Sequence, residues 1–122
     1  MGKRDRTIAV DFDGVIHDYQ DGFKDGSLYG DPMPGAQDTL KRLVEEGYKI
    51  VIFTVRLNSV WYESEKDKNI YKDKIAVWLS EHGIKAGTHF HDLTGEKPPA
   101  LVYIDDRAMR FTKWEDIRKY FC

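Results

Sequence analysis

The chain has a single cysteine, Cys122, at its last position. One terminal thiol excludes an intramolecular disulfide and any cysteine-based zinc site within the monomer. Long apolar runs are also missing: the charged residues 1–6 are followed by a short apolar run, far too short for a signal sequence or a membrane span. We therefore expect a protein of the reducing cytoplasm.

An excess of one charge is absent as well. The 19 basic and 21 acidic side chains give a formal net charge of −2, which excludes a global electrostatic attraction to nucleic acid or membranes. A local patch of basic side chains is still compatible with this net charge. The 122 residues suffice for one hydrophobic core but not for two. We expect residues 1–122 to form one domain.

What the sequence does have is an apolar stretch, residues 7–15, that stops on two carboxylates. Val, Ile and Phe favour a buried strand, which would end at Asp11, and Gly14 permits the sharp turn that carries Asp13. Two acids at the end of a parallel strand indicate a site for chemistry or metal. The alternative is an ordinary strand followed by an acidic turn, because Asp and Gly are common turn residues.

Further strands and helices alternate along the chain. Apolar periodicity predicts helices over 35–46 and 67–82, and apolar runs predict strands over 49–54, 86–91 and 101–105. Residues 16–31 are expected to form a loop with room for a small hairpin, residues 58–68 stay unassigned, and a capping box at 112–115 predicts a terminal helix. This order predicts an α/β fold, a three-layer α/β/α sandwich with a mainly parallel sheet.

Polar residues also end the later strands. Thr54 ends the second strand, and the last strand runs into Asp105 and Asp106, so all of them should share one edge with Asp11. Carboxylates this close raise each other's pKa unless a cation lies between them, and oxygen donors without Cys or His favour Mg²⁺ over zinc. A calcium loop starting at Asp11 is excluded, because Ile16 stands where an EF-hand needs Gly.

The order of these motifs resembles the haloacid dehalogenase (HAD) superfamily, and most closely its phosphatase branch. The match spans residues 7–106: Asp-x-Asp-Gly-Val, a strand ending in Thr54, and Lys97 ahead of a strand ending in two Asp residues. The resemblance implies a Rossmann-like core and a Mg²⁺-dependent hydrolysis of phosphomonoesters through an aspartyl-phosphate. The gaps between the motifs are too short for a cap domain, so only residues 16–31, residues 57–66 or a neighbouring subunit would cover the site.

The resemblance assigns the roles. Asp11 would be the nucleophile and Asp13 the general acid and base, while Thr54 and Lys97 would hold the phosphate. The metal ligands would be the backbone carbonyl of Asp13 and the side chains of Asp11, Asp105 and Asp106, and which of Asp105 and Asp106 binds the metal directly stays open. The alternative for Lys97 is a solvated loop lysine ahead of two prolines.

Two arginines flank the same edge. Arg56 and Arg107 would bind the substrate phosphate or a distal anion, and a surface salt bridge is the alternative for each. His89 and His91 alternate as residues of one strand face do, but no third soft ligand accompanies them, which argues against a metal there.

Two other functions are alternatives to the phosphatase. A phosphoacceptor receiver domain also uses acids, Mg²⁺, Thr and Lys, but its Lys comes last, whereas here Asp105 and Asp106 follow Lys97. A non-catalytic binding module would have no need of Asp13. The substrate stays open, from small phosphorylated metabolites to nucleotides or phosphorylated oligonucleotides, and so does the oligomeric state.

Overall fold

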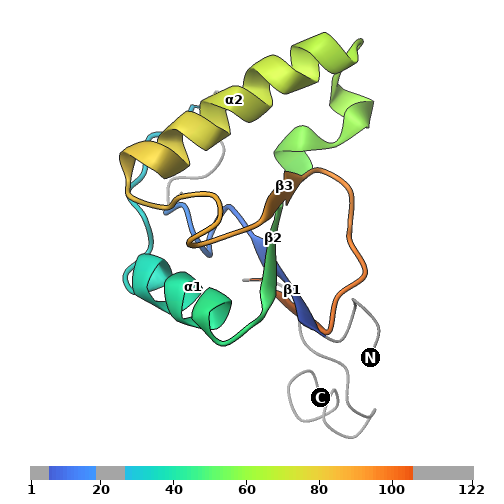
Figure 1. Ribbon diagram of the computed structural model, residues 1–122. Coiled ribbons are helices and arrows are strands. Elements are labelled where there is room, and N and C mark those ends of the chain that lie inside the picture. The colour runs from blue at the N-terminus through green and yellow to red at the C-terminus, as the bar shows by residue number, and fades with distance from the viewer. Residues whose placement is uncertain (1–5, 19–26, 106–122) are drawn as a thin grey trace, which may run out of the picture.

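The computed structural model describes residues 6–18 and 27–105, and Figure 1 shows their arrangement. The protein has an α/β fold in which a four-stranded, all-parallel sheet is flanked by helices, as in Rossmann-like three-layer folds. The predicted fold class is confirmed. The elements are β1 (Thr7–Asp11), α1 (Ala36–Glu45), β2 (Lys49–Phe53), the 3₁₀ turns Val55–Leu57 and Ser59–Trp61, α2 (Glu65–Glu81), β3 (Asp92–Thr94) and β4 (Val102–Ile104).

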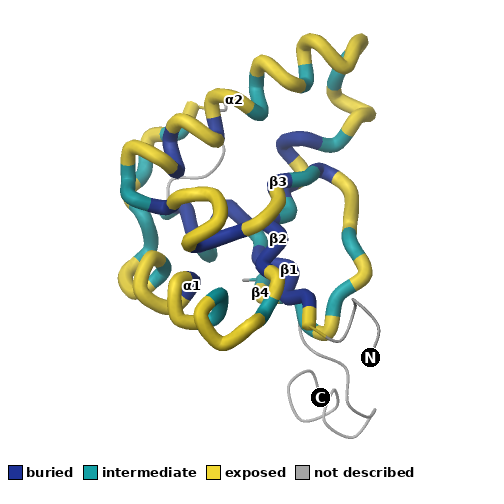
Figure 2. The backbone as a smooth tube through the Cα atoms, in the orientation of Figure 1, coloured by how far each residue is buried: buried dark blue, intermediate teal, exposed yellow. Residues whose placement is uncertain are grey.

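The hydrophobic core lies between the sheet and the two helices. Ile8 and Val10 of β1 alternate with residues that face the other side of the sheet, and they pack in one buried cluster with side chains of α1 and α2. Figure 2 shows β1 and β2 mostly buried at the centre and the outer faces of both helices exposed. In the described part of the chain, no helix is long and apolar enough to cross a bilayer. The terminal helix predicted from Thr112 lies outside the described residues.

The helix ends follow from capping residues. Gly47 and Gly83 have φ of 94° and 76°, a left-handed conformation that glycine adopts easily, and they end α1 and α2 where the sequence predicts. α2 begins two residues earlier than expected, at Glu65, because the Ser64 hydroxyl accepts a hydrogen bond from the Asp67 amide at 3.2 Å.

The strand predicted over residues 86–91 is wrong. Ala86 and Phe90 form an isolated bridge around a turn, and the strand β3 begins only at Asp92. The turn is closed by the buried His89, whose ring Nδ1 accepts a hydrogen bond from the Lys85 amide at 3.0 Å. The alternation of His89 and His91 therefore reflects a turn and not a pleated strand.

His89 makes the stability of the fold depend on pH. Burial lowers the pKa of His89 below its ordinary value of 6.5, and the nearby charges of Lys41 and Lys85 lower it further. Below 6.5 and down to that lowered pKa, the unfolded chain binds a proton that the folded chain does not, so the free energy of unfolding should fall as the pH decreases through this range. Urea unfolding across this range would measure the effect.

A matched pair of variants isolates that contribution. In His89→Asn the amide oxygen can still accept the Lys85 bond, but nothing titrates, so the pH dependence should become shallower than in the wild type. His91→Asn is the control, because the exposed His91 ring also accepts a backbone bond, from Ile50 at 3.0 Å. Equal slopes in wild type and His89→Asn would contradict the assignment.

Candidate functional site

Three strands bring polar residues to the carboxyl edge of the sheet. β1 ends at Asp11, and the register Val10↔Ile104 places the next residue of the β4 chain, Asp105, beside it. On the other side of β1, Asp11 pairs with Phe53, after which Thr54 follows. The structure thus places Asp105, Asp11 and Thr54 at adjacent strand ends, as the sequence predicted.

The order of the strands reverses at this edge of the sheet. The chain runs from β1 outward to β2 and β3, and then returns to place β4 on the opposite side of β1, which gives the order β3-β2-β1-β4. The order therefore reverses between β1 and β4. In open parallel sheets, ligands bind at the carboxyl ends of the strands beside such a reversal. Asp11 and Asp105 end the two strands that flank it.

A compact turn follows β1. The Asp11 carboxylate accepts a hydrogen bond from the Phe12 amide at 2.9 Å, and Gly14 takes a φ of 84° that favours glycine. The His17 carbonyl accepts from the Gly14 amide at 2.8 Å, and the His17 amide donates to the Phe12 carbonyl at 2.8 Å. This turn carries Asp13 and brings His17 back toward it.

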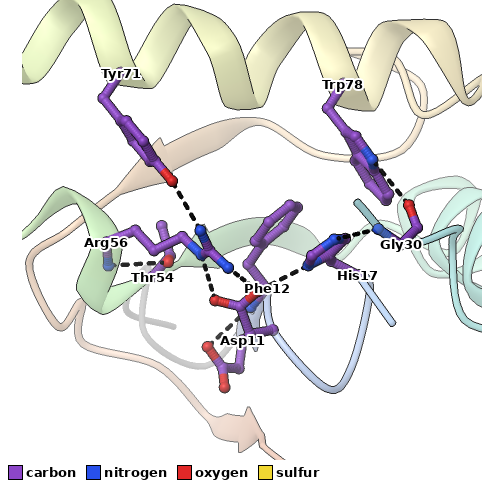
Figure 3. A network of polar contacts seen from close by, with 9 residues as sticks. Asp11, Phe12, His17, Gly30, Thr54, Arg56, Tyr71 and Trp78 are labelled. Carbon is purple, nitrogen blue, oxygen red and sulfur yellow. Dashed lines mark hydrogen bonds and ion pairs between the residues drawn. The ribbon is translucent and has the colours of Figure 1, made fainter. Parts of the chain in front are cut away.

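Two side chains that Figure 3 labels, Arg56 and His17, hold the Asp13 carboxylate. The Arg56 guanidinium donates through Nε to Oδ2 at 2.6 Å and through Nη2 to Oδ1 at 3.0 Å. The His17 ring contacts Oδ1 through Nδ1 at 2.8 Å. Bidentate, charge-assisted bonds of this kind fix an orientation as well as adding energy.

The tautomer of His17 follows from its second contact. The Gly30 amide donates to Nε2 at 3.0 Å, so Nε2 is the acceptor and Nδ1 carries the hydrogen that is donated to Asp13. The ring is fully buried and stacks on Phe12 with centroids 5.2 Å apart. Both ring nitrogens are thus satisfied in the neutral form.

Asp13 and Arg56 are both charged in the folded protein. Burial by itself raises the pKa of Asp13, but hydrogen bonds from His17 and Arg56, with the charge of Arg56, outweigh burial and lower the pKa below 3.8. Burial likewise opposes the charged form of Arg56, but the hydrogen bonds to Asp13 raise its pKa overall. Near neutral pH the two side chains are therefore an ion pair.

Arg56 is placed differently from the sequence expectation. Its pair with Asp13 is buried, with 5% of Arg56 exposed, so the surface salt bridge considered from the sequence is not what forms. Arg56 also donates through Nη1 to the Tyr71 hydroxyl at 2.8 Å, while the Tyr62 hydroxyl donates to the Arg56 carbonyl at 2.5 Å. The guanidinium thus faces Asp13 and α2.

Thr54 and Lys97 have distinct surroundings. Thr54 is buried, and its hydroxyl accepts from the Arg56 amide at 3.2 Å, which shapes the turn that presents Arg56. The exposed Lys97 ammonium lies 4.9 Å from the centre of the Tyr103 ring, a cation–π contact on β4. The Tyr103 hydroxyl donates to the Pro98 carbonyl, which ties this loop to the strand.

Two of the predicted site residues, Asp106 and Arg107, lie outside the described residues. Within residues 6–18 and 27–105, no group of three His, Cys, Asp or Glu side chains is close enough to hold a metal ion. Mg²⁺, however, is typically bound by one or two carboxylates together with waters and a substrate phosphate. The half-buried pair Asp11 and Asp105, with oxygen donors alone, fits that requirement.

Three residues of this network were missed in the sequence. His17 and Gly30 fall in a segment predicted only as a loop, and Tyr71 falls in a predicted helix without a functional role assigned to it. The available signal was the short spacing between Asp13 and His17, which allows a turn to bring them together.

Comparison with known proteins gives a structural relative. No protein-family model and no curated protein matches the chain. A solved structure from Bacteroides thetaiotaomicron, described as a conserved protein, is similar with a TM-score of 0.57 and 27% identity. The similarity covers 93% of this chain and 86% of that one, so the two share the fold over nearly their whole length.

Proposed function

We propose that this chain is a cap-less, Mg²⁺-dependent phosphatase of the HAD type that hydrolyses phosphomonoesters through an aspartyl-phosphate. The observation that carries the proposal is the pair Asp11 and Asp105 at adjacent strand ends, where the strand order reverses. A carboxylate at this place can act as a nucleophile toward phosphorus, and a second acid can bind a cation that neutralises the phosphate charge. We propose that the protein works in the cytoplasm.

The side chains carry out two half-reactions. One Asp11 oxygen attacks phosphorus and forms the acyl phosphate, while Asp13 gives a proton to the leaving oxygen. Because the ion pair with Arg56 keeps Asp13 ionised near neutral pH, Asp13 takes up this proton from the monoanionic form of the substrate phosphate, whose second pKa is about 6. Ionised Asp13 then takes a proton from water, which attacks the acyl phosphate and releases phosphate and free Asp11. The bonds from Arg56 and His17 stabilise the ionised Asp13, which is the form needed between the two half-reactions.

Other groups would bind the phosphate and the metal. Bound Mg²⁺ would neutralise charge on the carboxylates and the phosphate. Asp11, Asp105, Asp106 and the backbone carbonyl of Asp13 would hold it. Thr54, Lys97 and Arg107 would hydrogen-bond the phosphate, with Arg56 acting on Asp13.

The strand order disfavours the receiver alternative. Receiver domains have the flavodoxin-like order, in which the first strand lies between the second and the third. Here β1 lies between β2 and β4. A non-catalytic module that binds Mg²⁺ is the remaining alternative.

The test is a phosphatase screen with a metal-site variant. Sugar phosphates, nucleotides, phosphopeptides and phosphorylated oligonucleotides should include a substrate that is turned over with Mg²⁺ and not in excess chelator. Asp105→Asn should weaken Mg²⁺ activation by at least about 10-fold, since even outer-shell changes cost that much. The half-saturating Mg²⁺ concentration measures the effect.

Asp92→Asn is the matched control for that variant. Asp92 begins β3 at the opposite edge of the sheet and, like Asp11, accepts a hydrogen bond from the next amide. It should leave the Mg²⁺ dependence unchanged. Full turnover in excess chelator would refute the proposal, and Mg²⁺ binding without turnover of any phosphomonoester would identify the non-catalytic module.

A further inference from the structure

Asp13 is connected to helix α2 along two separate hydrogen-bonded paths. The first runs through Arg56, whose Nε and Nη2 bind the carboxylate and whose Nη1 donates to the Tyr71 hydroxyl at 2.8 Å. Both Arg56 and Asp13 are buried, so this path is shielded from water. Tyr71 is thus the helical end of the first path.

The second path runs through His17. Its Nδ1 binds the Asp13 carboxylate, and its Nε2 accepts from the Gly30 amide at 3.0 Å. The Gly30 carbonyl in turn accepts from Trp78 Nε1 at 3.1 Å. A side chain at position 30 would clash, because a Cβ there would lie 1.6 Å from the Asp18 carbonyl oxygen. Trp78 is the helical end of the second path.

Both paths therefore end on one face of one helix. Tyr71 and Trp78 are seven positions apart within α2, which is about two helical turns or 10.5 Å. Figure 3 shows both side chains reaching from α2 toward Arg56 and toward Gly30 beside His17. The helix spans the two sides from which the Asp13 carboxylate is held.

We infer that Tyr71 and Trp78 are positioning residues that hold Asp13 for proton transfer, with α2 as the rigid support; this rests on the proposed phosphatase function. Asp13 sits in a turn beyond its strand, and a turn alone holds a side chain less firmly than a helix does. Proton transfer needs placement within hydrogen-bond reach in both half-reactions. The paths through Arg56 and His17 supply that placement.

A change of leaving group separates positioning of Asp13 from a general loss of structure. An alkyl phosphate needs a proton on its leaving oxygen, whereas an aryl phosphate with an acidic phenol does not. Tyr71→Phe removes only the hydroxyl at the end of the first path. With an alkyl phosphate, kcat should fall about 10-fold while KM changes less than about 2-fold.

With the aryl phosphate, the burst of phenol release should change less than about 2-fold in Tyr71→Phe, because this burst reports the first half-reaction alone. Trp78→Phe, which removes the indole N–H, should show the same difference between substrates. Tyr48→Phe is the control, since Tyr48 is also half-buried but lies against Arg6, away from this network. Equal slowing of both substrates, an effect on KM alone, or no effect in Tyr71→Phe would overturn the inference.

A second measurement does not depend on activity. Urea unfolding of Asp13→Asn, Tyr71→Phe and the double variant should be non-additive, with the double variant losing less stability than the sum, because the two residues are joined through Arg56. Additive losses would overturn the link between Tyr71 and Asp13. If the wild type hydrolyses no phosphomonoester, the proposed function fails, and the unfolding cycle still decides whether α2 holds Asp13.

Discussion

Asp11→Asn is expected to abolish turnover of every phosphomonoester substrate. The amide is a far weaker nucleophile than the carboxylate, so the acyl phosphate cannot form and the covalent route is lost. The fall in kcat should exceed the roughly 10²–10⁴-fold that loss of an acid–base group causes. Steady-state assays at saturating substrate, with mass spectrometry of the quenched enzyme, would measure it.

Urea unfolding separates lost chemistry from lost structure in this variant. The Asn side chain keeps an oxygen that can accept the Phe12 amide bond. The unfolding curve gives the folded fraction by which kcat is corrected. Substantial residual turnover, or a phosphate adduct mapped to another residue, would show that Asp11 is not the nucleophile.

The elements that the sequence predicts best are those whose pattern is purely local. β1 and β2 are continuous apolar runs, which identify buried parallel strands without knowledge of their neighbours. α1 combines a helical apolar period with Gly47 at its end. The strand over 86–91 fails because the buried His89 closes a turn there, and a polar alternation cannot reveal which backbone amide its ring accepts.

The residues of the candidate site also differ in how well the sequence predicts them. Strand-end residues such as Asp11 and Thr54 are predictable because parallel strands share a carboxyl edge. The side chain that binds Asp13 is not predictable from the sequence. Arg56 lies 43 positions further along the chain, and its guanidinium could equally have faced the substrate. Helical spacing places Tyr71 on the inner face of α2 but does not say that its hydroxyl accepts from Arg56.

Asp13→Asn should slow turnover by roughly 10²–10⁴-fold while Mg²⁺ binding persists. The amide cannot give a proton to the leaving oxygen or take one from water. The structure adds a second effect, because the variant removes the charge of Asp13 from its buried ion pair with Arg56. Breaking a buried ion pair in this way costs about 3–5 kcal/mol of stability, which urea unfolding would measure.

The loss of stability must be separated from the loss of chemistry. The unfolding curve gives the folded fraction at the assay temperature, and kcat is corrected by that fraction. Asp73→Asn, at an exposed position of α2, is the control and should change neither quantity. A corrected kcat equal to that of the wild type would remove Asp13 from the chemistry and leave it a structural partner of Arg56.

The leaving group provides the sharpest outcome for Asp13→Asn. With an aryl phosphate the first half-reaction needs no acid, so Asp11 should still be phosphorylated, whereas the attacking water lacks its base. Phosphate should therefore accumulate on Asp11 in Asp13→Asn and not in the wild type, as mass spectrometry of the quenched proteins would show. An adduct that is absent from the variant, or present equally in both proteins, would mean that Asp13 does not act as the base, and that the bonds from Arg56 and His17 serve the fold alone.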